Sequence, residues 1–372
     1  MSATAELSGT SGGEERELLR TTMAALLTRH TAHAPEERAG STADLWALLE
    51  ESGMTLVSVP ESAGGSGGEL GDFAALAQTC GYHAASVPLV ETTMLAGWAL
   101  AAAGLTVPVG PLTVAPPTAT ATAALVPDGT GLRVHGQLCA VPWARATRHV
   151  VLLIALPGEP NGVVLAVIDP RDCVVEHGAN LAGEPRDTLV LPAGGVACAR
   201  LPAGGPDPFA LTLRGALGRA LLIVGSLRRV LDLTVRHARE REQFGRPINR
   251  FQAVQQQIAA LAGAVEQAAA MAGLAVAVLD RGDAGSEAVM AAKICAAQAA
   301  SVAITVGHQV HGAIGFTTEH ELHLHTRRLM SWRDEYGDES EWSAELGARV
   351  ANAGPGGLWN LLTTPPPAEA RR

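Results

Sequence analysis

The sequence predicts an α+β protein of several domains. An N-terminal helical domain (residues 1–105) is followed by a β domain (106–205), a C-terminal four-helix bundle (206–352) and a tail rich in proline and glycine (353–372). Apolar residues recur at helical spacing in the first and third parts, and short β-branched runs between glycine and proline fill the second. The chain has 372 residues, of which 47% are hydrophobic and 17% charged, so it is long and apolar enough to bury a sizeable core.

The N-terminal domain is predicted to be helical after an irregular tail over residues 1–15. Leucine and methionine recur at helical spacing from Leu18 onward. The segment 60–68 is too rich in glycine for regular structure and is predicted to be a loop. Further helices are expected over residues 42–52, 70–82 and 92–103.

The middle domain is predicted to be a small β domain. Its runs of four to six aliphatic or β-branched residues are bounded by turn signals, which is typical of strands. Strands are expected over residues 132–135, 150–155, 163–168 and 188–191.

The C-terminal domain is predicted to be a bundle of long helices. Apolar stripes at helical spacing run over residues 217–231 and 254–279. A third helix is expected to begin at Ser286, which can cap it, and a fourth near Glu319. Long helices with small, alanine-rich contacts favour a four-helix bundle, whose outer faces we expect to build contacts between chains.

Composition excludes several function classes. A net charge of −10 and a pI near 5.6 argue against a nucleic-acid interface. No run of 18 consecutive apolar residues occurs and the N-terminus lacks an apolar signal core, so we expect a cytoplasmic protein without membrane spans. The five cysteines are scattered without a C-x-x-C pair, which predicts neither a disulfide framework nor a metal site.

Two motifs in the bundle carry the strongest functional signal. Residues 241–255 read R-x-x-F-G-x-P-I-x-x-F-Q-x-x-Q, between the first two bundle helices, and residues 309–316 read Q-V-H-G-A-I-G-F. Both motifs closely resemble those of the acyl-CoA dehydrogenase family. A weaker similarity to that family's N-terminal domain begins near Thr42. The resemblance extends to about Val350 and implies an acyl-CoA dehydrogenase-like fold, an FAD cofactor and an acyl-CoA substrate.

The resemblance assigns roles to five residues. It implies that Arg241, Phe244 and Gln252 hold the pyrophosphate and adenosine of FAD, and that Gln309 and Gly312 lie along the dinucleotide. In this family these groups bind the FAD of the neighbouring subunit. The chemistry fits, because arginine presents a planar fork to phosphate and phenylalanine a flat face to adenine. The alternative is an ordinary helix-connecting turn, with Arg241 paired to its neighbouring glutamate and Phe244 in the core.

The β domain departs from the family pattern. The family's T-E-P-x-A-G-S-D segment, which meets flavin and acyl-CoA, has no counterpart in residues 111–122. Where the family has a threonine near the flavin ring, this chain has Pro142, which offers neither a hydroxyl nor an N–H. Contacts from this β domain to the flavin ring are therefore in doubt.

The catalytic base is the larger departure. In most members of the family a glutamate lies about 20 residues after the glycine–phenylalanine pair and removes the proton next to the thioester carbonyl. Here that position holds Tyr336, and a phenol is largely protonated at neutral pH. A shift of one residue makes Glu335 the candidate base, with Asp334 or Asp338 also near. The alternative is that these acids form a solvated turn at a helix end. Some family members carry the base on the first bundle helix instead, but residues 214–219 of this chain contain no acid.

The histidines of residues 320–325 do not form a zinc motif. Their spacing of i, i+3 and i+5 distributes them around a helix, whereas H-E-x-x-H places two histidines on one face. We expect them to serve surface or packing roles.

Three functions remain open at this point. The first is an FAD-dependent acyl-CoA dehydrogenase subunit that joins a homologous subunit and supplies the adenosine and pyrophosphate half-site, as in family members that resemble steroid side-chain degraders. The second is a self-sufficient homotetramer that uses Glu335. The third is a silent scaffold subunit or a flavin monooxygenase on the same fold. An electron-transfer flavoprotein is one electron acceptor that the resemblance allows.

Overall fold

The computed structural model describes residues 3–31, 41–128, 131–282 and 285–354. The chain divides into two compact units. We call Met1–Leu76 with Ala85–Gly215 the α/β unit, and Ala77–Ala84 with Ala216–Arg372 the bundle unit. Each unit is described by itself. The three-part division expected from the sequence stays a prediction.

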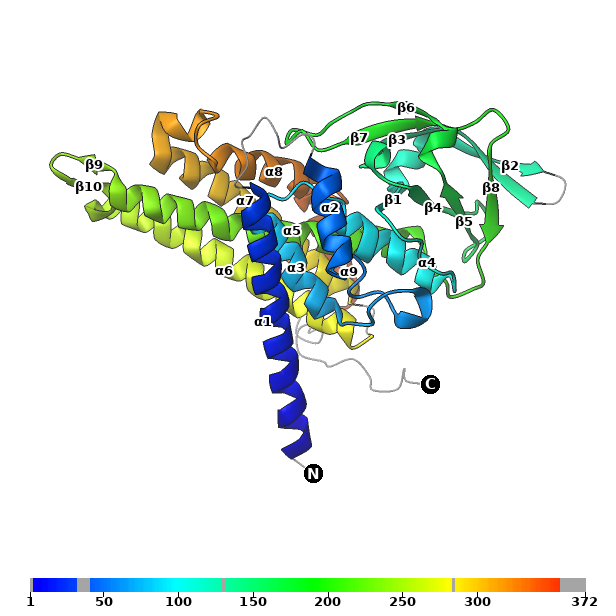
Figure 1. The fold of residues 1–372 in the computed structure, drawn as a ribbon, viewed down its shortest axis with the longest axis horizontal. Helices are drawn as coiled ribbons and strands as arrows, with labels where there is room; N and C mark the ends of the chain where they lie inside the picture. Colours follow the sequence, from blue (N-terminus) through cyan, green and yellow to red (C-terminus); the bar gives the residue numbers. More distant parts are fainter. Residues whose placement is uncertain (1–2, 32–40, 129–130, 283–284, 355–372) are drawn as a thin grey trace. The chain divides into compact units, whose positions relative to one another are not determined.

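The helices of the α/β unit follow the predicted pattern with two differences. The expected irregular tail is wrong, because α1 covers Ala3–Thr31, and Glu17 and Arg20 form an ion pair one turn apart on it. The stretch expected as one helix over 92–103 is a π-helix, Val90–Gly97, followed by α4. The remaining helices are α2 (Ser41–Glu51), α3 (Leu70–Tyr82) and α4 (Trp98–Ala102) (Figure 1).

The β region forms a mixed sheet in the order β1-β4-β5-β8-β3-β7-β6, with β2 paired to β3. Only the β1–β4 pair is parallel among the described strands. Alternating aliphatic residues such as Val150, Leu152 and Leu189 fill the core of this sheet. The strands are β1 (Leu112–Val114), β2 (Ala123–Asp128), β3 (Gly131–Pro142), β4 (His149–Ala155), β5 (Val163–Ile168), β6 (Val174–Glu176), β7 (Arg186–Val190) and β8 (Val196–Arg200).

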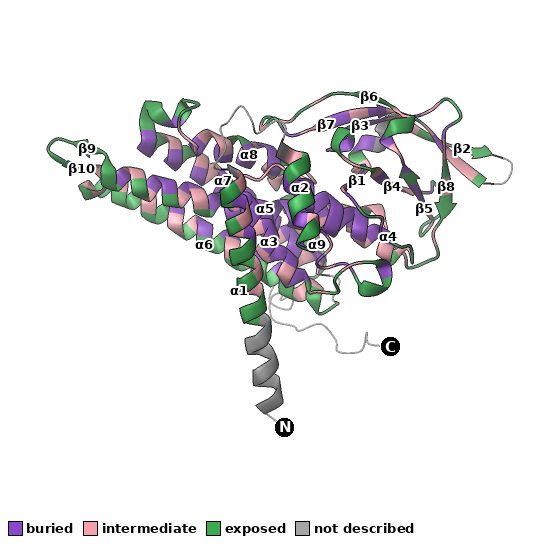
Figure 2. Ribbon diagram, in the orientation of Figure 1, coloured by how far each residue is buried: buried purple, intermediate pink, exposed green. Residues whose placement is uncertain are grey.

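The bundle unit is built on long, alanine-rich helices. The large side chains of α5 face the interior, so most of this helix is purple in Figure 2. The helices are α5 (Pro208–Glu240), α6 (Gln252–Asp280), α7 (Ser286–His311), α8 (Leu322–Asp334) and α9 (Glu339–Asn352). A short hairpin of β9 (Glu242–Gln243) and β10 (Arg246–Pro247) joins α5 to α6, and the 3₁₀ turn η8 (Gly312–Phe316) follows α7. Most of the expected C-terminal tail lies outside the described residues.

Three helices are long and apolar enough to cross a membrane by length and composition: α5, α6 and the segment Ser286–Phe316. A search for continuous apolar runs misses these three helices, because a few polar residues interrupt each of them without lowering its mean hydropathy much. Their burial differs: 83% of the apolar window is buried in α5, 56% in Ser286–Phe316 and 33% in α6. Small residues such as Ala260, Gly263 and Ala270 lie on α6, whose outer face is left partly uncovered by the chain itself.

Candidate functional site

The β9–β10 hairpin presents the first motif. Arg241 directly follows α5, and its backbone N–H donates to the His237 carbonyl at 2.8 Å, which continues the helical pattern into the hairpin. The Arg241 carbonyl accepts from the Ile248 N–H at 2.8 Å and closes the hairpin at its base. The hairpin stands at the end of α5 and α6 (Figure 1). The backbone therefore fixes Arg241 at the point where the helix ends.

Phe244 lies at the turn of this hairpin. Its side chain is 92% exposed, and its backbone adopts a left-handed φ of +52°, which is unusual for a bulky residue. Its ring meets Phe251 edge-on at 6.1 Å, and the Arg246 guanidinium lies 4.2 Å from the Phe251 ring centre. The alternative that places Phe244 in the core is wrong. A large exposed aromatic ring in a strained backbone conformation is consistent with the predicted binding role, which stays a hypothesis.

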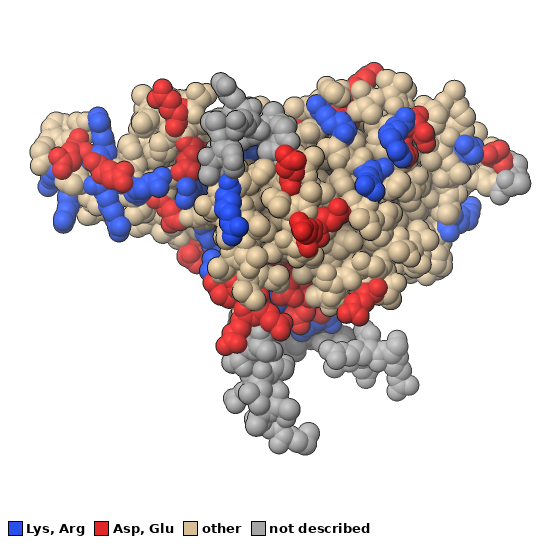
Figure 3. Space-filling view, viewed as in Figure 1, with Lys and Arg blue, Asp and Glu red and all other residues tan. Residues whose placement is uncertain are grey.

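Charged side chains gather around this hairpin. Figure 3 shows basic and acidic residues side by side at this end of the bundle unit, where Arg239, Arg241 and Arg246 are all exposed. Among the residues that the structure describes, no ion pair involves Arg241, so the alternative pairing with Glu242 is absent. The Arg241 guanidinium therefore keeps its donors for another molecule.

The other predicted dinucleotide residues are all accessible. Gln252 is the first residue of α6, Gln309 lies in the last turn of α7, and both are exposed. Gly312 ends α7 at φ +64° and ψ −142°, a conformation that is essentially restricted to glycine. A Cβ atom at Gly312 would meet nothing within 4 Å, so its backbone is open to a ligand.

These residues fit a dinucleotide by the chemistry of their donors. Arg241 offers a fork for a pyrophosphate, Phe244 offers an open aromatic face, and Gly312 offers a bare stretch of backbone. The rings of His237 and His311 stack at 4.5 Å, which places the end of α7 beside the last turn of α5. The two motifs, separate in sequence, are thus brought to one end of the bundle unit.

The candidate base lies in the turn between α8 and α9 and is held in an ion pair. The Nε–H of Arg219, on α5, donates to Glu335 Oε2 at 2.6 Å. The Arg219 side chain is 2% exposed and that of Glu335 is 20% exposed. The same guanidinium lies 5.3 Å from the centre of the Tyr336 ring. A carboxylate bound to a buried guanidinium is stabilised as an anion, which opposes its taking up a proton.

The turn that carries Glu335 is tied down from both sides. The Lys293 ammonium, fully buried on α7, donates to the carbonyls of Arg333 (2.6 Å) and Gly337 (2.8 Å). The indole N–H of Trp342 donates to the Tyr336 carbonyl at 3.0 Å. Burial lowers the pKa of Lys293 to about 7, against the opposing effect of Glu335. Sequence reasoning missed both Arg219 and Lys293, although Lys293 is the only lysine in the chain.

The structure does not bring the two groups of site residues together. Arg219 and Arg241 are 22 residues apart along one continuous helical path, which corresponds to about 33 Å at 1.5 Å per residue. Glu335 contacts Arg219, whereas Phe244 lies just beyond Arg241. The turn that carries Glu335 and the hairpin that carries Arg241 and Phe244 therefore lie far apart in the folded chain.

The other candidates found in the sequence have structural roles. His325 is buried on α8, and its Nδ1 forms a hydrogen bond with Ser226 Oγ at 3.0 Å. Within the described ranges, no group of three or more histidines, cysteines and acids could hold a metal ion. Burial raises the pKa of the Cys80 thiol to about 12, which makes it a poor nucleophile. In the α/β unit, Pro142 ends β3, and its carbonyl accepts from the buried Thr113 hydroxyl at 2.7 Å.

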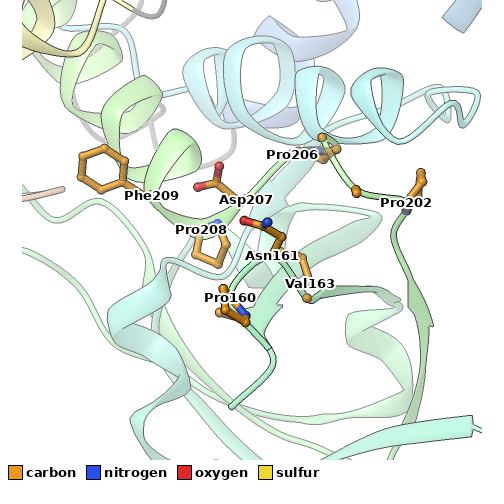
Figure 4. A pocket seen from close by; sticks show the side chains of 13 residues that line it. Pro160, Asn161, Val163, Pro202, Pro206, Asp207, Pro208 and Phe209 are labelled. Atoms are coloured by element: carbon orange, nitrogen blue, oxygen red, sulfur yellow. The ribbon is translucent and has the colours of Figure 1, made fainter. Parts of the chain in front are cut away.

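A separate pocket lies in the α/β unit and contains none of the predicted site residues. It has a volume of about 580 Å³ and lies between the loop before β5 and the segment that leads into α5 (Figure 4). Pro160, Asn161, Asp207 and Phe209 are among the residues that line it. Asp207 Oδ1 accepts from the Ala210 N–H at 2.9 Å, so this carboxylate already serves to cap α5.

Comparisons with known proteins identify the family of the chain. The model of the acyl-CoA dehydrogenase N-terminal domain matches residues 13–106, and that of the C-terminal domain matches residues 213–338. The chain is 32% identical over 321 residues to acyl-CoA dehydrogenase IpdE2 of Mycobacterium tuberculosis, covering 85% of this chain and 91% of the relative. It is 30% identical to IpdE2 of Mycolicibacterium smegmatis, covering 91% and 99%.

Solved structures share the fold. A chain of the ChsE4–ChsE5 complex from Mycobacterium tuberculosis superposes with a TM-score of 0.81 at 24% identity, covering 91% of this chain and 98% of that one. A chain of a variant of the Tcur3481–Tcur3483 steroid ACAD superposes with a TM-score of 0.79 at 26% identity, covering 92% and 99%.

The fold and the matched domains define an FAD-dependent oxidoreductase. The chain belongs to the acyl-CoA dehydrogenase family. The expected fold is confirmed, with N-terminal helices, a middle β sheet and C-terminal helices. The roles of Arg241, Phe244, Gln252, Gln309, Gly312 and Glu335 stay predictions.

Proposed function

We propose that this chain is an acyl-CoA dehydrogenase subunit that works with a second, homologous chain and supplies the half-site for the adenosine and pyrophosphate of FAD. The observation that carries the proposal is the Arg219–Glu335 ion pair. The only acid that a one-residue shift places at the base position is engaged by a buried guanidinium, whereas Arg241 and Phe244 are open. One half of a site is thus closed and the other half is accessible.

In this proposal the residues of the chain bind and orient. Arg241 binds the pyrophosphate, Phe244 stacks on adenine, and Gln252 and Gln309 form hydrogen bonds to ribose or phosphate oxygens. Gly312 lets the backbone approach the dinucleotide. When bound, FAD supplies the acceptor for a hydride from the carbon β to the thioester. The partner chain supplies the carboxylate that removes the α-proton.

The separation along α5 supports sharing across chains. About 33 Å of helix lies between Arg219 and Arg241. One chain therefore cannot place Glu335, beside Arg219, and Arg241 on the same small group of a bound cofactor. The partly uncovered, small-residue face of α6 is one that a second chain can cover. The ChsE4–ChsE5 structure is that of a complex by name, which supports assembly of two different chains here.

The acyl group is proposed to be a steroid-type or other lipid acyl-CoA. The solved relative with 26% identity is by name a steroid ACAD, and this supports that substrate class. We further propose an electron-transfer flavoprotein as the acceptor of the electrons.

A flavin spectrum tests the proposal. The chain is purified alone, and again after co-expression with a homologous chain that carries a glutamate at the position of Tyr336. We expect a colourless protein alone and a flavin spectrum that bleaches with acyl-CoA in the complex. A chain that carries flavin alone and bleaches with acyl-CoA would contradict the proposal.

That result would instead support the self-sufficient enzyme with Glu335 as base. The observation in favour of this second candidate is that the Glu335 side chain keeps 20% of its surface exposed, so it is not sealed from a substrate.

A further inference from the structure

Three histidine rings join three segments of the bundle unit at the dinucleotide end. His237 lies in the last turn of α5, His311 ends α7, and His320 precedes α8. His237 and His311 stack at 4.5 Å with an interplanar angle of 24°, and His311 meets His320 edge-on at 4.7 Å. We call these three rings the imidazole stack. Arg241 follows His237 by one turn, and Gly312 follows His311 directly.

The surroundings of His311 and His320 leave no place for an added proton. His311 Nδ1 lies 2.7 Å from the Gly307 carbonyl, which can only accept, so this nitrogen carries the proton. His311 Nε2 is buried, and within the described residues it has no hydrogen-bond partner. His320 Nδ1 accepts the Leu322 N–H at 3.1 Å, so this nitrogen must be unprotonated. A proton added to either ring would lack an acceptor or break a bond to the first turn of α8.

The charges around the stack also oppose protonation. Burial is the largest cause that lowers the pKa of His311, to about 4, while the hydrogen bond to the Gly307 carbonyl opposes the shift and His237, His320 and His308 add to it. Burial likewise lowers the pKa of His237, with Arg241 acting in the same direction and Glu240 against it.

His320 follows the same pattern on the other side of the stack. Burial lowers its pKa, Arg236 and His323 add to this, and Glu321 opposes it. The Glu321 carboxylate is already bound by Arg229 and Arg236, at 2.8 and 3.2 Å. The nearby acid is therefore committed to two guanidinium groups.

We propose that the imidazole stack is an acid-sensitive junction that holds the ends of α5 and α7 together only while its rings are neutral. Protonation of His311 places a charge without an acceptor between two other imidazoles and separates the two helix ends. The consequence for FAD rests on the proposed function: Arg241 and Gly312 lose their common position, and the dinucleotide is released as the pH falls.

The sign follows from the direction of the pKa shift. The pKa of His311 is lowered from 6.5 to about 4, so the opened state binds the proton more tightly than the closed state. The closed junction is then stable above about pH 6.5 and weakens as the pH falls toward 4. At pH 5, His311 alone favours opening by about 30-fold relative to neutral pH.

Hydrogen exchange of the purified chain tests the junction without flavin. We expect the protection of segments 233–241 and 307–320, corrected for the intrinsic rate, to fall by about 30-fold between pH 7.5 and pH 5. His311→Phe keeps a flat ring and leaves the Gly307 carbonyl to its ordinary helical bond, so this variant should lose most of the pH dependence. His177→Gln, an exposed histidine of the α/β unit, is the matched control and should behave as the unmodified chain.

A histidine NMR titration keeps the proposal falsifiable if His311→Phe does not fold. Resonances of the stack that titrate near 6.5, or equal protection at pH 5 and 7.5, would overturn the junction. The flavin complex provides the second arm, in which we expect FAD release at pH 5 that His311→Phe suppresses. If the junction opens but no partner confers flavin at any pH, the proposed function fails and the junction stands.

Discussion

Arg219 Nε and Glu335 Oε2 lie 2.6 Å apart, on a helix and a turn that are 116 positions apart in the sequence. Glu335 directly precedes Tyr336, the position at which the resemblance to the family predicts the catalytic carboxylate. A group that serves as a base must accept a proton during turnover, and a buried guanidinium at hydrogen-bond distance favours the charged carboxylate instead. The relationship therefore converts a candidate catalytic acid into a candidate structural anchor for the α8–α9 turn.

The first prediction concerns Glu335→Gln. In the flavin-loaded complex, we expect exchange of the substrate α-proton to stay within about threefold of the unmodified rate, because the partner carries the base. The free energy of unfolding of the chain should fall by about 1–3 kcal/mol, since a neutral amide replaces the anion beside buried Arg219. Isotope exchange and urea unfolding measure the two effects. Loss of exchange with unchanged stability would instead make Glu335 the base.

The second prediction concerns the single lysine. Burial lowers the pKa of Lys293 to about 7 from 10.5, so the unfolded chain binds more protons between these values and stability should rise with pH across this window. The contribution is at most about 1.4 kcal/mol per pH unit. Because no other lysine titrates, Lys293→Met should remove this slope.

Urea unfolding at several pH values from 7 to 10 checks the lysine prediction. The stability of the variant relative to the unmodified chain should be lower at pH 10 than at pH 7, because the neutral amine of Lys293 still donates to the Arg333 and Gly337 carbonyls. A slope that is the same in both proteins would show that Lys293 keeps its ordinary pKa.

The third prediction concerns Phe244→Ala. Base stacking on an aromatic ring contributes about 1–3 kcal/mol, so the complex should bind FAD about 5- to 150-fold more weakly. Thermal stability of the chain alone should not fall, because the ring is 92% exposed and its left-handed backbone is strained. Phe209→Ala is a matched control, since Phe209 is 46% exposed in the α/β unit. Equal FAD affinity in both variants would remove Phe244 from the half-site.

The fourth prediction concerns Arg241→Lys. A lysine keeps the charge but loses the planar fork, so we expect FAD binding to weaken by about tenfold while the net charge stays the same. Arg250→Lys, on the same connection between α5 and α6, is the control and should change little. Fluorescence titration of the complex with FAD measures both. A larger loss in Arg250→Lys would move the phosphate contact to that residue.

Local sequence patterns predicted much of the fold. The strand over 163–168 and the helix over 70–82 agree with the structure at both ends, because periodicity and turn residues decide such segments. The helix over residues 3–15 was missed because its glycines and polar residues carry no apolar stripe. The π-helix at Val90–Gly97 was missed as well, since its spacing looks helical in the sequence.

The candidate site was predictable only where one segment carries it. Residues 241–252 form one continuous motif, so the sequence itself places Arg241, Phe244 and Gln252 near one another. The structure adds that Phe244 is exposed. The Arg219–Glu335 pair and the His237–His311 stack join residues far apart in the chain, and composition or spacing does not reveal such contacts. Glu335 alone in the sequence suggests a base, whereas Glu335 beside Arg219 suggests an anchor.

The burial of Lys293 has a consequence for chemical labelling. In the folded chain the Lys293 side chain is covered and donates to two carbonyls. An amine-directed dye should therefore react with this side chain only slowly while the bundle unit stays folded. The dye reaches Lys293 when the bundle opens around α7, so mass spectrometry of the labelled Lys293 peptide would count opening events directly.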